Sequence, residues 1–299
     1  MQGKILVFGA DGLVGSRFTD LYHKETPFVT PSISELDISN TKSIEDFFAE
    51  NEKEFQAVIN FAAFTNVDEA EKERNNKKGP VWKVNADGPK NIAEACRKFS
   101  KYFIQTSTDF VFPGIKNNPG PYAEDAETPD SPDSISWYGW TKLEGERAVL
   151  KTYDNSAIVR ISYPFRAHYP GKIDFARNIL MLYDEGKLYP MFSDQKITPS
   201  FIDEIAKALY LLLEEKKTGI FHIASRTVTT PFEFASYLLE KTRGAKRAVK
   251  KGSLREFMKV AGRTPRPLFG GLKTEKTQEK LGITFMTWKE AIDEFVRQL

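Results

Sequence analysis

A tyrosine and a lysine stand four residues apart in Tyr138-Gly139-Trp140-Thr141-Lys142, at the start of a helix-like run. In a helix this spacing puts both side chains on one face, one turn apart. A free tyrosine titrates near pH ~10, too high for proton transfer at neutral pH, and a nearby ammonium group favours the phenolate. The pair therefore predicts a general acid or base whose pKa the lysine lowers. A solvated helix face has the same spacing, so other segments must decide between the two interpretations.

The amino-terminal segment predicts a dinucleotide-binding turn. A strand-like run leads directly into Gly9-Ala10-Asp11-Gly12-Leu13-Val14-Gly15, and a helix-like run follows. In this context Gly9 allows a tight turn, Gly12 lets the backbone approach a pyrophosphate, and Gly15 permits close packing of helix on strand. The amino terminus of the helix offers N–H groups and partial positive charge to phosphate. A turn that needs positive φ explains one glycine but not this spacing.

Hydroxyl side chains gather where another apolar run ends, at Thr106-Ser107-Thr108-Asp109. Doubly wound sheets place their ligands at the carboxyl ends of the strands. A hydroxyl there is suited to hydrogen-bond a carbonyl oxygen while Tyr138 passes that oxygen a proton. The alternative is that these residues only cap the turn that begins at Pro113-Gly114. The glycine turn and the Tyr138–Lys142 pair, in the same chain, favour the functional interpretation.

Three motifs form one set: the glycine turn at 9–15, S-T-D-F-V-F-P-G at 107–114, and Y-G-W-T-K-L-E-G-E at 138–146. Together they resemble the extended short-chain dehydrogenases/reductases, and within these the dTDP-4-dehydrorhamnose reductase family. The resemblance covers nearly the whole chain. Further matching segments are Asn60 to Glu71, Val84 to Gly88, Arg263-Thr264-Pro265-Arg266-Pro267, Leu281-Gly282 and Trp288.

The resemblance implies NAD(P)H-dependent reduction of a nucleotide-linked 4-keto-6-deoxy sugar, in the first place dTDP-4-dehydro-L-rhamnose to dTDP-L-rhamnose in carbohydrate biosynthesis. It implies that Tyr138 donates a proton to the developing alkoxide and that Lys142 assists it and holds the nicotinamide ribose. Thr108 would hydrogen-bond the carbonyl oxygen. Asp109 and Tyr163 fall where the family contacts the sugar nucleotide, although the rhamnose-forming enzymes resemble one another in having a tryptophan at the position of Tyr163.

The resemblance also implies a cofactor site. NAD-specific sites usually carry an acid about 20 residues beyond the glycines, whereas Phe28-Val29-Thr30-Pro31-Ser32 offers hydroxyls at this point. Arg17 would suit a 2′-phosphate, or is simply an exposed helix residue. The sequence therefore favours NADPH, with NADH also open. The implied cofactor residues are Gly9, Gly12, Leu13, Val14, Gly15, Asp37 and Ile38 beside the adenine, Ala62, Ala63 and Thr65 along the ribose and phosphates, Thr106, Tyr138 and Lys142.

Strand-like and helix-like runs alternate along most of the chain, which predicts an α/β fold with a Rossmann-type doubly wound parallel sheet. The strand-like runs are 4–8, 27–30, 56–60, 101–107, 156–161 and 219–223. The helix-like runs are 13–24, 41–51 with Thr41 as N-cap, 81–99, 137–152 and 201–215.

The resemblance implies a smaller, discontinuous substrate-binding lobe beside this domain. Residues 1–162 form the NAD(P)-binding domain, to which 200–224 return, and 163–199 and 225–299 form most of the sugar-nucleotide-binding lobe. Arg263 or Arg266 would then face the diphosphate, because guanidinium groups suit phosphate oxygens.

Composition limits the remaining classes. Lys plus Arg number 43 and Asp plus Glu 41, a formal charge of +2, so nothing indicates a nucleic-acid or membrane partner. The single Cys96 excludes an internal disulfide. No run approaches the ~20 apolar residues of a membrane span, and no signal peptide precedes the first strand. We expect a cytoplasmic monomer or homodimer that binds a nucleotide sugar and no metal.

Further departures from the family pattern also leave the sugar open, among them Tyr163-Pro164-Phe165, which lacks the glycine that often follows. The stretch between Thr108 and Tyr138 is longer than usual, and 72–80 is expanded. The alternatives are a reductase, epimerase or dehydratase of another nucleotide sugar, a non-catalytic subunit like the beta subunit of methionine adenosyltransferase, or a plain dinucleotide sensor. A dehydratase would carry a glutamate after Asp109, where this chain has Phe110.

Overall fold

The computed structural model, which describes residues 3–299, contains a six-stranded sheet with the strand order β2-β1-β3-β4-β5-β7. The chain pairs β2 with one side of β1 and β3 with the other side, both in parallel. This reversal of strand order makes a topological switch point, and it confirms the predicted doubly wound α/β fold. The strands are β1 (Lys4–Phe8), β2 (Phe28–Val29), β3 (Phe55–Asn60), β4 (Tyr102–Thr108), β5 (Ser156–Ile161) and β7 (Gly219–Ile223).

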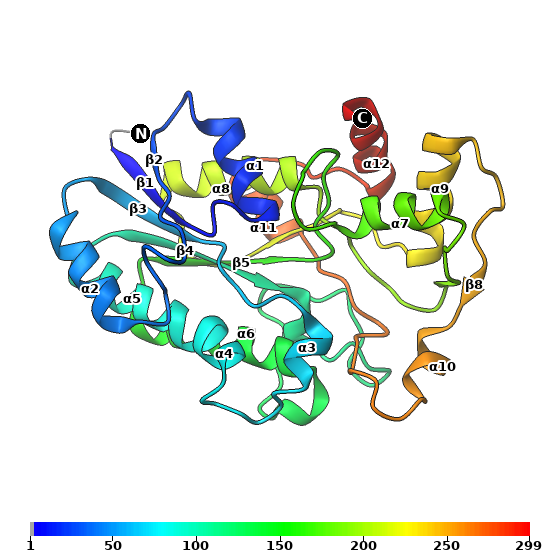
Figure 1. Cartoon of the computed structure of the whole chain (residues 1–299), viewed down its shortest axis with the longest axis horizontal. Coiled ribbons are helices and arrows are strands. Elements are labelled where there is room, and N and C mark those ends of the chain that lie inside the picture. The colour runs from blue at the N-terminus through cyan, green and yellow to red at the C-terminus, as the bar shows by residue number, and fades with distance from the viewer. Residues whose placement is uncertain (1–2) are drawn as a thin grey trace. The chain divides into compact units, whose positions relative to one another are not determined.

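Helices cover both faces of this sheet. Figure 1 shows α1 and α8 over one face and α2, α5 and α6 over the other. The core beneath α2 and α5 contains Phe48, Ile92, Phe103 and Ile158, all fully buried. The helices are α1 (Leu13–Tyr22), α2 (Thr41–Glu50), α3 (Val67–Glu71), α4 (Pro80–Trp82), α5 (Gly88–Lys98), α6 (Trp137–Thr152) and α8 (Ile202–Glu215).

Two local predictions about these helices need correction. The N-cap of α2 is Asn40, whose side chain accepts a hydrogen bond from Ser43 N, and Thr41 is the first helical residue. The predicted helix 81–99 is interrupted by a π-helical turn, η1 (Lys83–Asp87). Pro89 lies in the first turn of α5, where its missing N–H cannot complete an α-helical bond to the preceding turn. The wider turn accommodates that gap.

Contacts divide the chain into two units. The first consists of residues 1–111, 136–160 and 206–221, and the second of 112–135, 161–205 and 222–299. In the second unit an aromatic core contains Phe165, Phe201, Phe234 and Phe295. Its elements are α7 (Phe175–Asp184), α9 (Pro231–Arg243), α10 (Leu254–Met258), α11 (Glu275–Leu281), α12 (Trp288–Gln298) and the parallel pair β6 (Met191–Phe192) and β8 (Lys251–Gly252).

The segment 112–135 belongs to the second unit, whereas we expected it within the nucleotide-binding domain. Tyr122 pairs through its backbone with Gly271 and Lys273, at 2.9 and 2.7 Å. The buried carboxylate of Glu124 accepts hydrogen bonds from Thr277 N and Oγ1, at 3.1 and 2.7 Å. These partners are about 150 residues away along the chain, so local sequence patterns do not reveal them.

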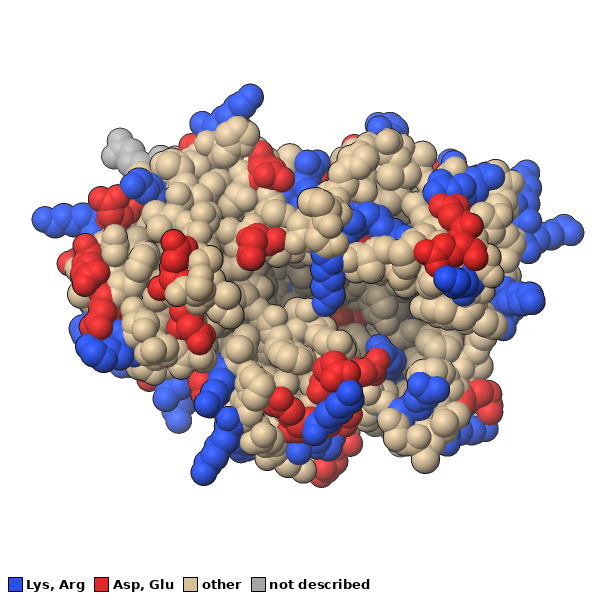
Figure 2. Space-filling view, viewed as in Figure 1, with Lys and Arg blue, Asp and Glu red and all other residues tan. Residues whose placement is uncertain are grey.

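The surface agrees with the balanced composition. Figure 2 shows acidic and basic side chains interspersed on the face in view, without a broad region of one sign. Within residues 3–299, no helix is both long and apolar enough to cross a membrane.

Candidate active site

Tyr138 lies in the first turn of α6, a helix that contacts β4 and η2 (Asp109–Val111). Ser136 begins the helix by accepting a hydrogen bond from Gly139 N at 3.1 Å. Glu71 accepts a second bond at the same helix end, from Trp137 N at 2.8 Å. Two capping groups therefore fix the turn that carries Tyr138, because amino-terminal N–H groups have no partner within the helix.

The Tyr138 hydroxyl lies near Thr108 at the carboxyl end of β4, close enough for Thr108 to act on its pKa. Thr108 is 6% exposed, and its Oγ1 donates to Asp109 Oδ1 at 3.3 Å. Burial raises the pKa of Tyr138 to about 12, the Thr108 hydroxyl opposes this shift, and the Asp109 carboxylate adds to it. The structure thus brings together Tyr138 and Thr108, the two residues predicted at the reacting carbonyl, and places Asp109 beside them.

Lys142 lies one turn further along α6 and is only 4% exposed. Its Nζ donates a hydrogen bond to the carbonyl oxygen of Thr106 at 2.8 Å. Burial lowers the pKa of Lys142 to about 8, against an opposing attraction from Glu146. The expected lowering of the tyrosine pKa by this lysine is not seen: burial raises the pKa of Tyr138, and Thr108 is the group that opposes this rise.

The glycine turn between β1 and α1 has the close backbone contacts that the motif predicts. Gly9 has φ +69°, and a Cβ there would lie 2.7 Å from Ala62 N. A Cβ on Gly15 would lie 2.3 Å from the carbonyl oxygen of Gly9. Gly12 is the N-cap of α1 and has no side chain to cap the helix, so its backbone is open to close approach at the first turn, which begins with Leu13 and Val14. This cradle fits a pyrophosphate group.

The other predicted cofactor residues lie at neighbouring strand ends. Ala62, Ala63 and the exposed Thr65 follow β3, and Thr106 Oγ1 donates to Asn60 O at 2.8 Å. Asp37 is exposed and accepts from Ser39 N, whereas Ile38 is buried. The side chain of Ile38 packs close to Gly88.

The loop after β2 contains a carboxylate, Glu35, whose position beside Ser32 the sequence alone did not indicate. Glu35 Oε2 accepts hydrogen bonds from both Ser32 N and Ser32 Oγ, each at 2.7 Å. The loop was expected to offer hydroxyls without an acid at this point. The chain turns back between Ser32 and Leu36. This turn places the Glu35 carboxylate beside Ser32, where the sequence predicted only hydroxyl groups.

Two further polar residues of this region were missed. Asn85, on the π-helical turn, accepts from Phe64 N at 2.9 Å and donates to Phe64 O and to Thr141 Oγ1. It therefore joins the loop after β3 to the helix that carries the tyrosine. Ser107 Oγ is buried and has no hydrogen-bond partner within residues 3–299. A π-turn leaves no clear sequence signal, although Asn85 lies in a motif that fits the family pattern.

Tyr163 belongs to the second unit and has a left-handed backbone, with φ +44°. Gln195 Nε2 donates to its hydroxyl at 3.0 Å, and the Phe175 ring meets it edge-on at 5.1 Å. A left-handed conformation is uncommon for an aromatic residue and is retained only where surrounding contacts hold it. Its predicted role toward the sugar stays a prediction.

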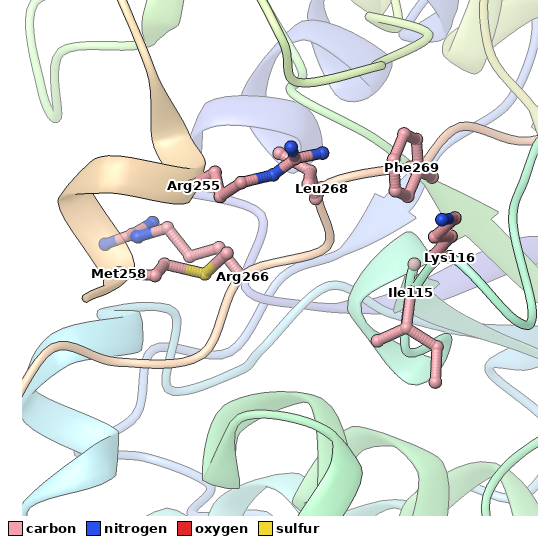
Figure 3. Close-up of a pocket in the computed structure, with 8 residues that line it drawn as sticks. Ile115, Lys116, Arg255, Met258, Arg266, Leu268 and Phe269 are labelled. Atoms are coloured by element: carbon pink, nitrogen blue, oxygen red, sulfur yellow. The ribbon is translucent and has the colours of Figure 1, made fainter.

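A cation-lined pocket of about 400 Å³ lies within the second unit. Figure 3 shows Arg255 and Arg266 on one side of it and Ile115 and Lys116 on the other. Asp194 holds the start of α10, and thus Arg255, by accepting from Ser253 Oγ and Leu254 N at 2.6 and 2.7 Å. Of the two arginines predicted to face a diphosphate, Arg266 lines this pocket. Arg263 instead lies over the Phe257 ring, at 4.3 Å. The remaining lining residues are Gly114, Met258, Leu268 and Phe269.

No group of three or more His, Cys, Asp or Glu side chains placed to hold a metal ion occurs in the part of the chain that the structure describes. Cys96 is buried and unpaired, and burial raises the pKa of its thiol well above the ordinary value.

Comparison with known proteins gives this arrangement a family. The model of the RmlD substrate binding domain matches residues 3–299. A dTDP-4-dehydrorhamnose reductase of Streptomyces griseus is 33% identical over 75% of this chain and 71% of that protein. A probable low-salt glycan biosynthesis reductase of Haloferax volcanii is 29% identical over 87% of each chain. The crystal structure of dTDP-4-dehydrorhamnose reductase from Bacillus anthracis in complex with NADP has a TM-score of 0.87, with 24% identity and 100% coverage of both chains. Since the family model spans all the residues described, this chain belongs to the RmlD substrate binding domain family.

Proposed function

We propose that this protein is an NAD(P)H-dependent reductase of a nucleotide-linked keto sugar. The observation that carries the proposal is the placement of Tyr138 near Thr108, with the buried Lys142 one helical turn further on, in the same unit as the glycine turn. Each of these groups has a task in reducing a carbonyl. The named reductases among the relatives support the same reaction class.

The tight contacts of Gly9 and Gly15 and the glycine at the start of α1 suit the cofactor pyrophosphate. Ala62, Ala63 and Thr65 would follow the ribose and phosphates, and Lys142 would reach the nicotinamide ribose. When bound, the reduced nicotinamide supplies the hydride, which the protein itself cannot provide.

Proton transfer falls to Tyr138. Because its pKa is raised to about 12, the phenol keeps its proton at neutral pH and can give it to an alkoxide that forms on the substrate. Thr108 would donate a hydrogen bond to the same oxygen, so that charge developing there meets a fixed donor. Lys142 would strengthen the acid, because a nearby ammonium stabilises the phenolate left behind.

The favoured cofactor is NADPH, with NADH as the alternative. The absence of an acid at Phe28–Ser32 in the sequence supports NADPH, as does Arg17 on α1 for a 2′-phosphate. The Glu35 carboxylate on Ser32 weighs toward NADH, since acids after the second strand bind the 2′-hydroxyl of NAD.

The substrate we propose is dTDP-4-dehydro-L-rhamnose, reduced to dTDP-L-rhamnose. Several relatives carry the name dTDP-4-dehydrorhamnose reductase, at about 30% identity. The pocket lined by Arg255, Arg266 and Lys116 has the charge and the apolar walls that a nucleoside diphosphate needs. Tyr163 and Asp109 would contact the sugar.

The test is oxidation of NADPH or NADH by the purified protein with dTDP-4-dehydro-L-rhamnose, followed by absorbance, with the product identified by NMR. Tyr138→Phe serves as the matched control, since it removes one oxygen. We expect the wild type to form dTDP-L-rhamnose. A wild-type protein that binds NADPH yet oxidises none with any keto-sugar nucleotide would refute the reductase proposal. Turnover with a UDP-linked or differently configured sugar alone would refute only the substrate.

A further inference from the structure

A buried ion pair joins α6, the helix that carries Tyr138 and Lys142, to β5. Arg160 on β5 and Glu146 on α6 have side chains that are 3% and 2% exposed. Arg160 Nε donates to both carboxylate oxygens at 3.0 and 3.2 Å, and Nη2 donates to Oε2 at 2.6 Å. Burying two charges costs several kcal/mol per ion, so such a pair is weak evidence for a role in stability alone. The roles already assigned in the proton transfer use neither residue.

Glu146 follows Lys142 by four residues on α6, which places the two side chains on one face of the helix. Lys142 is itself 4% exposed. An ammonium group in such surroundings loses most of its hydration, and a neutral carbonyl only partly replaces it. Lys142 Nζ donates a hydrogen bond to Thr106 O on β4.

Charged and titratable groups lie on several of the elements around this lysine. Tyr138 and Glu146 lie on its own helix, Asp109 on η2 stands next to Tyr138, and Arg160 comes from β5. Among them Glu146 is the group whose charge acts on Lys142, and it favours the ammonium form. Asp109 acts on Tyr138 instead.

We propose that Glu146, held in place by Arg160, is a positioning residue that keeps the buried side chain of Lys142 in its ammonium form, one turn away from Tyr138. The three Arg160 hydrogen bonds fix the carboxylate so that it cannot rotate away from the lysine or take up a proton. The inference deepens the proposed reductase function and rests on it for its catalytic meaning. The state of the lysine itself can be measured without substrate.

The decisive measurement is the titration of the Lys142 Nζ resonance by ¹⁵N NMR, assigned by its loss in Lys142→Met. In the wild type we expect a midpoint near pH 8. In Glu146→Gln the midpoint should fall by about one pH unit, because the favourable charge is gone and Arg160 is left facing the lysine. Glu146→Asp keeps the charge and should return the midpoint toward the wild-type value.

Glu144→Gln is the matched control, because it makes the same chemical change on the same helix in a carboxylate paired with Arg147. It should leave the midpoint unchanged. If Glu146→Gln does not fold, the double variant Glu146→Gln/Arg160→Gln avoids an isolated buried cation, and its midpoint should still fall. An unmoved midpoint in whichever of these variants folds would overturn the inference.

The alkaline limb of the rate profile should move in the same direction as the NMR midpoint, by a similar amount. A wild type that is inactive with every keto-sugar nucleotide would refute the reductase proposal, while the NMR titration would still decide the role of Glu146. A shifted NMR midpoint with an unshifted rate profile would overturn the catalytic part of the inference.

Discussion

The Tyr138–Lys142 site in the first unit and the pocket in the second unit differ in how firmly their cationic side chains are held. In the first unit Lys142 is buried and donates a hydrogen bond to a backbone carbonyl, and Tyr138 lies near Thr108. In the second unit the pocket cations Lys116 and Arg255 are solvent-exposed, on a loop and a short helix. Proton transfer demands fixed distances, whereas phosphate binding tolerates flexible charges. We therefore expect changes in the first unit to act on the rate of chemistry and changes in the second on substrate affinity.

The largest effect should come from the proton donor. Tyr138→Phe removes the hydroxyl and should lower kcat by about 10²–10⁴-fold, the usual contribution of a general acid. NADPH affinity, measured by fluorescence titration, should stay within about twofold. Full activity in this variant would mean that the first unit does not carry the chemistry as we describe it.

The glycine turn should show the next largest effect. In Gly15→Ala the new Cβ would lie 2.3 Å from Gly9 O, so the turn must shift. Overpacking of this kind costs about 1–3 kcal/mol. If the whole cost falls on cofactor binding, it corresponds to about 10–100-fold weaker binding. Calorimetric titration with NADPH measures the affinity for the cofactor, and thermal unfolding measures the stability of the fold, so the two effects can be separated. Gly186→Ala has open space around the new Cβ and serves as the control, though its φ of +69° gives a modest stability loss.

The pH dependence should report Lys142. Burial lowers its pKa to about 8, so the ammonium that assists Tyr138 is present below that pH and lost above it. kcat should therefore fall as pH rises through about 8, by up to tenfold per unit. A steady-state profile between pH 6 and pH 10 with saturating cofactor is the measurement. A flat profile would show that the charge of the lysine does not matter to the rate.

The pocket in the second unit should change affinity rather than rate. Arg266→Ala should raise the KM for the sugar nucleotide about tenfold, since charge-assisted bonds to phosphate contribute about 1.5–3 kcal/mol at most. Arg263→Ala is the matched control, because that guanidinium lies over Phe257 and is not among the pocket residues. Equal effects of the two variants would remove the pocket from the proposed site.

The smallest expected effect concerns the choice of cofactor. Glu35→Gln removes the carboxylate that Ser32 binds and should strengthen NADPH binding relative to NADH by about 2–5-fold, within the range of exposed charge interactions. Parallel titrations with both cofactors measure the ratio. An unchanged ratio would place the 2′ position away from Ser32 and Glu35.

Much of the active site could be predicted from the sequence because its motifs are local. The Gly9–Gly15 turn, the strand end at Thr108 and the Tyr138–Lys142 pair each depend on short spacings that backbone geometry converts directly into position. The chain order of these segments indicated the fold class, which the sheet confirms. The N-cap of α2 was misplaced by one residue, since Asn40 and Thr41 are both good caps.

Other features could not be predicted because they depend on contacts between distant parts of the chain. Asn85 meets Thr141 across 56 residues, and Tyr122 and Glu124 bind partners near residue 275. No spacing rule connects such positions. The direction of the Tyr138 pKa shift was also missed, because burial depends on the whole packing around the ring.

The sequence by itself determined which groups we propose for the chemistry, since helix and strand periods fix how neighbours along the chain are presented. Only the tertiary structure decided the electrostatic state of those groups. It buried Lys142, joined Glu146 to Arg160 on β5 and selected Arg266 rather than Arg263 for the pocket. The physical reason is that hydration and charge act through space, so the energy of an ionised side chain depends on which segments pack against it.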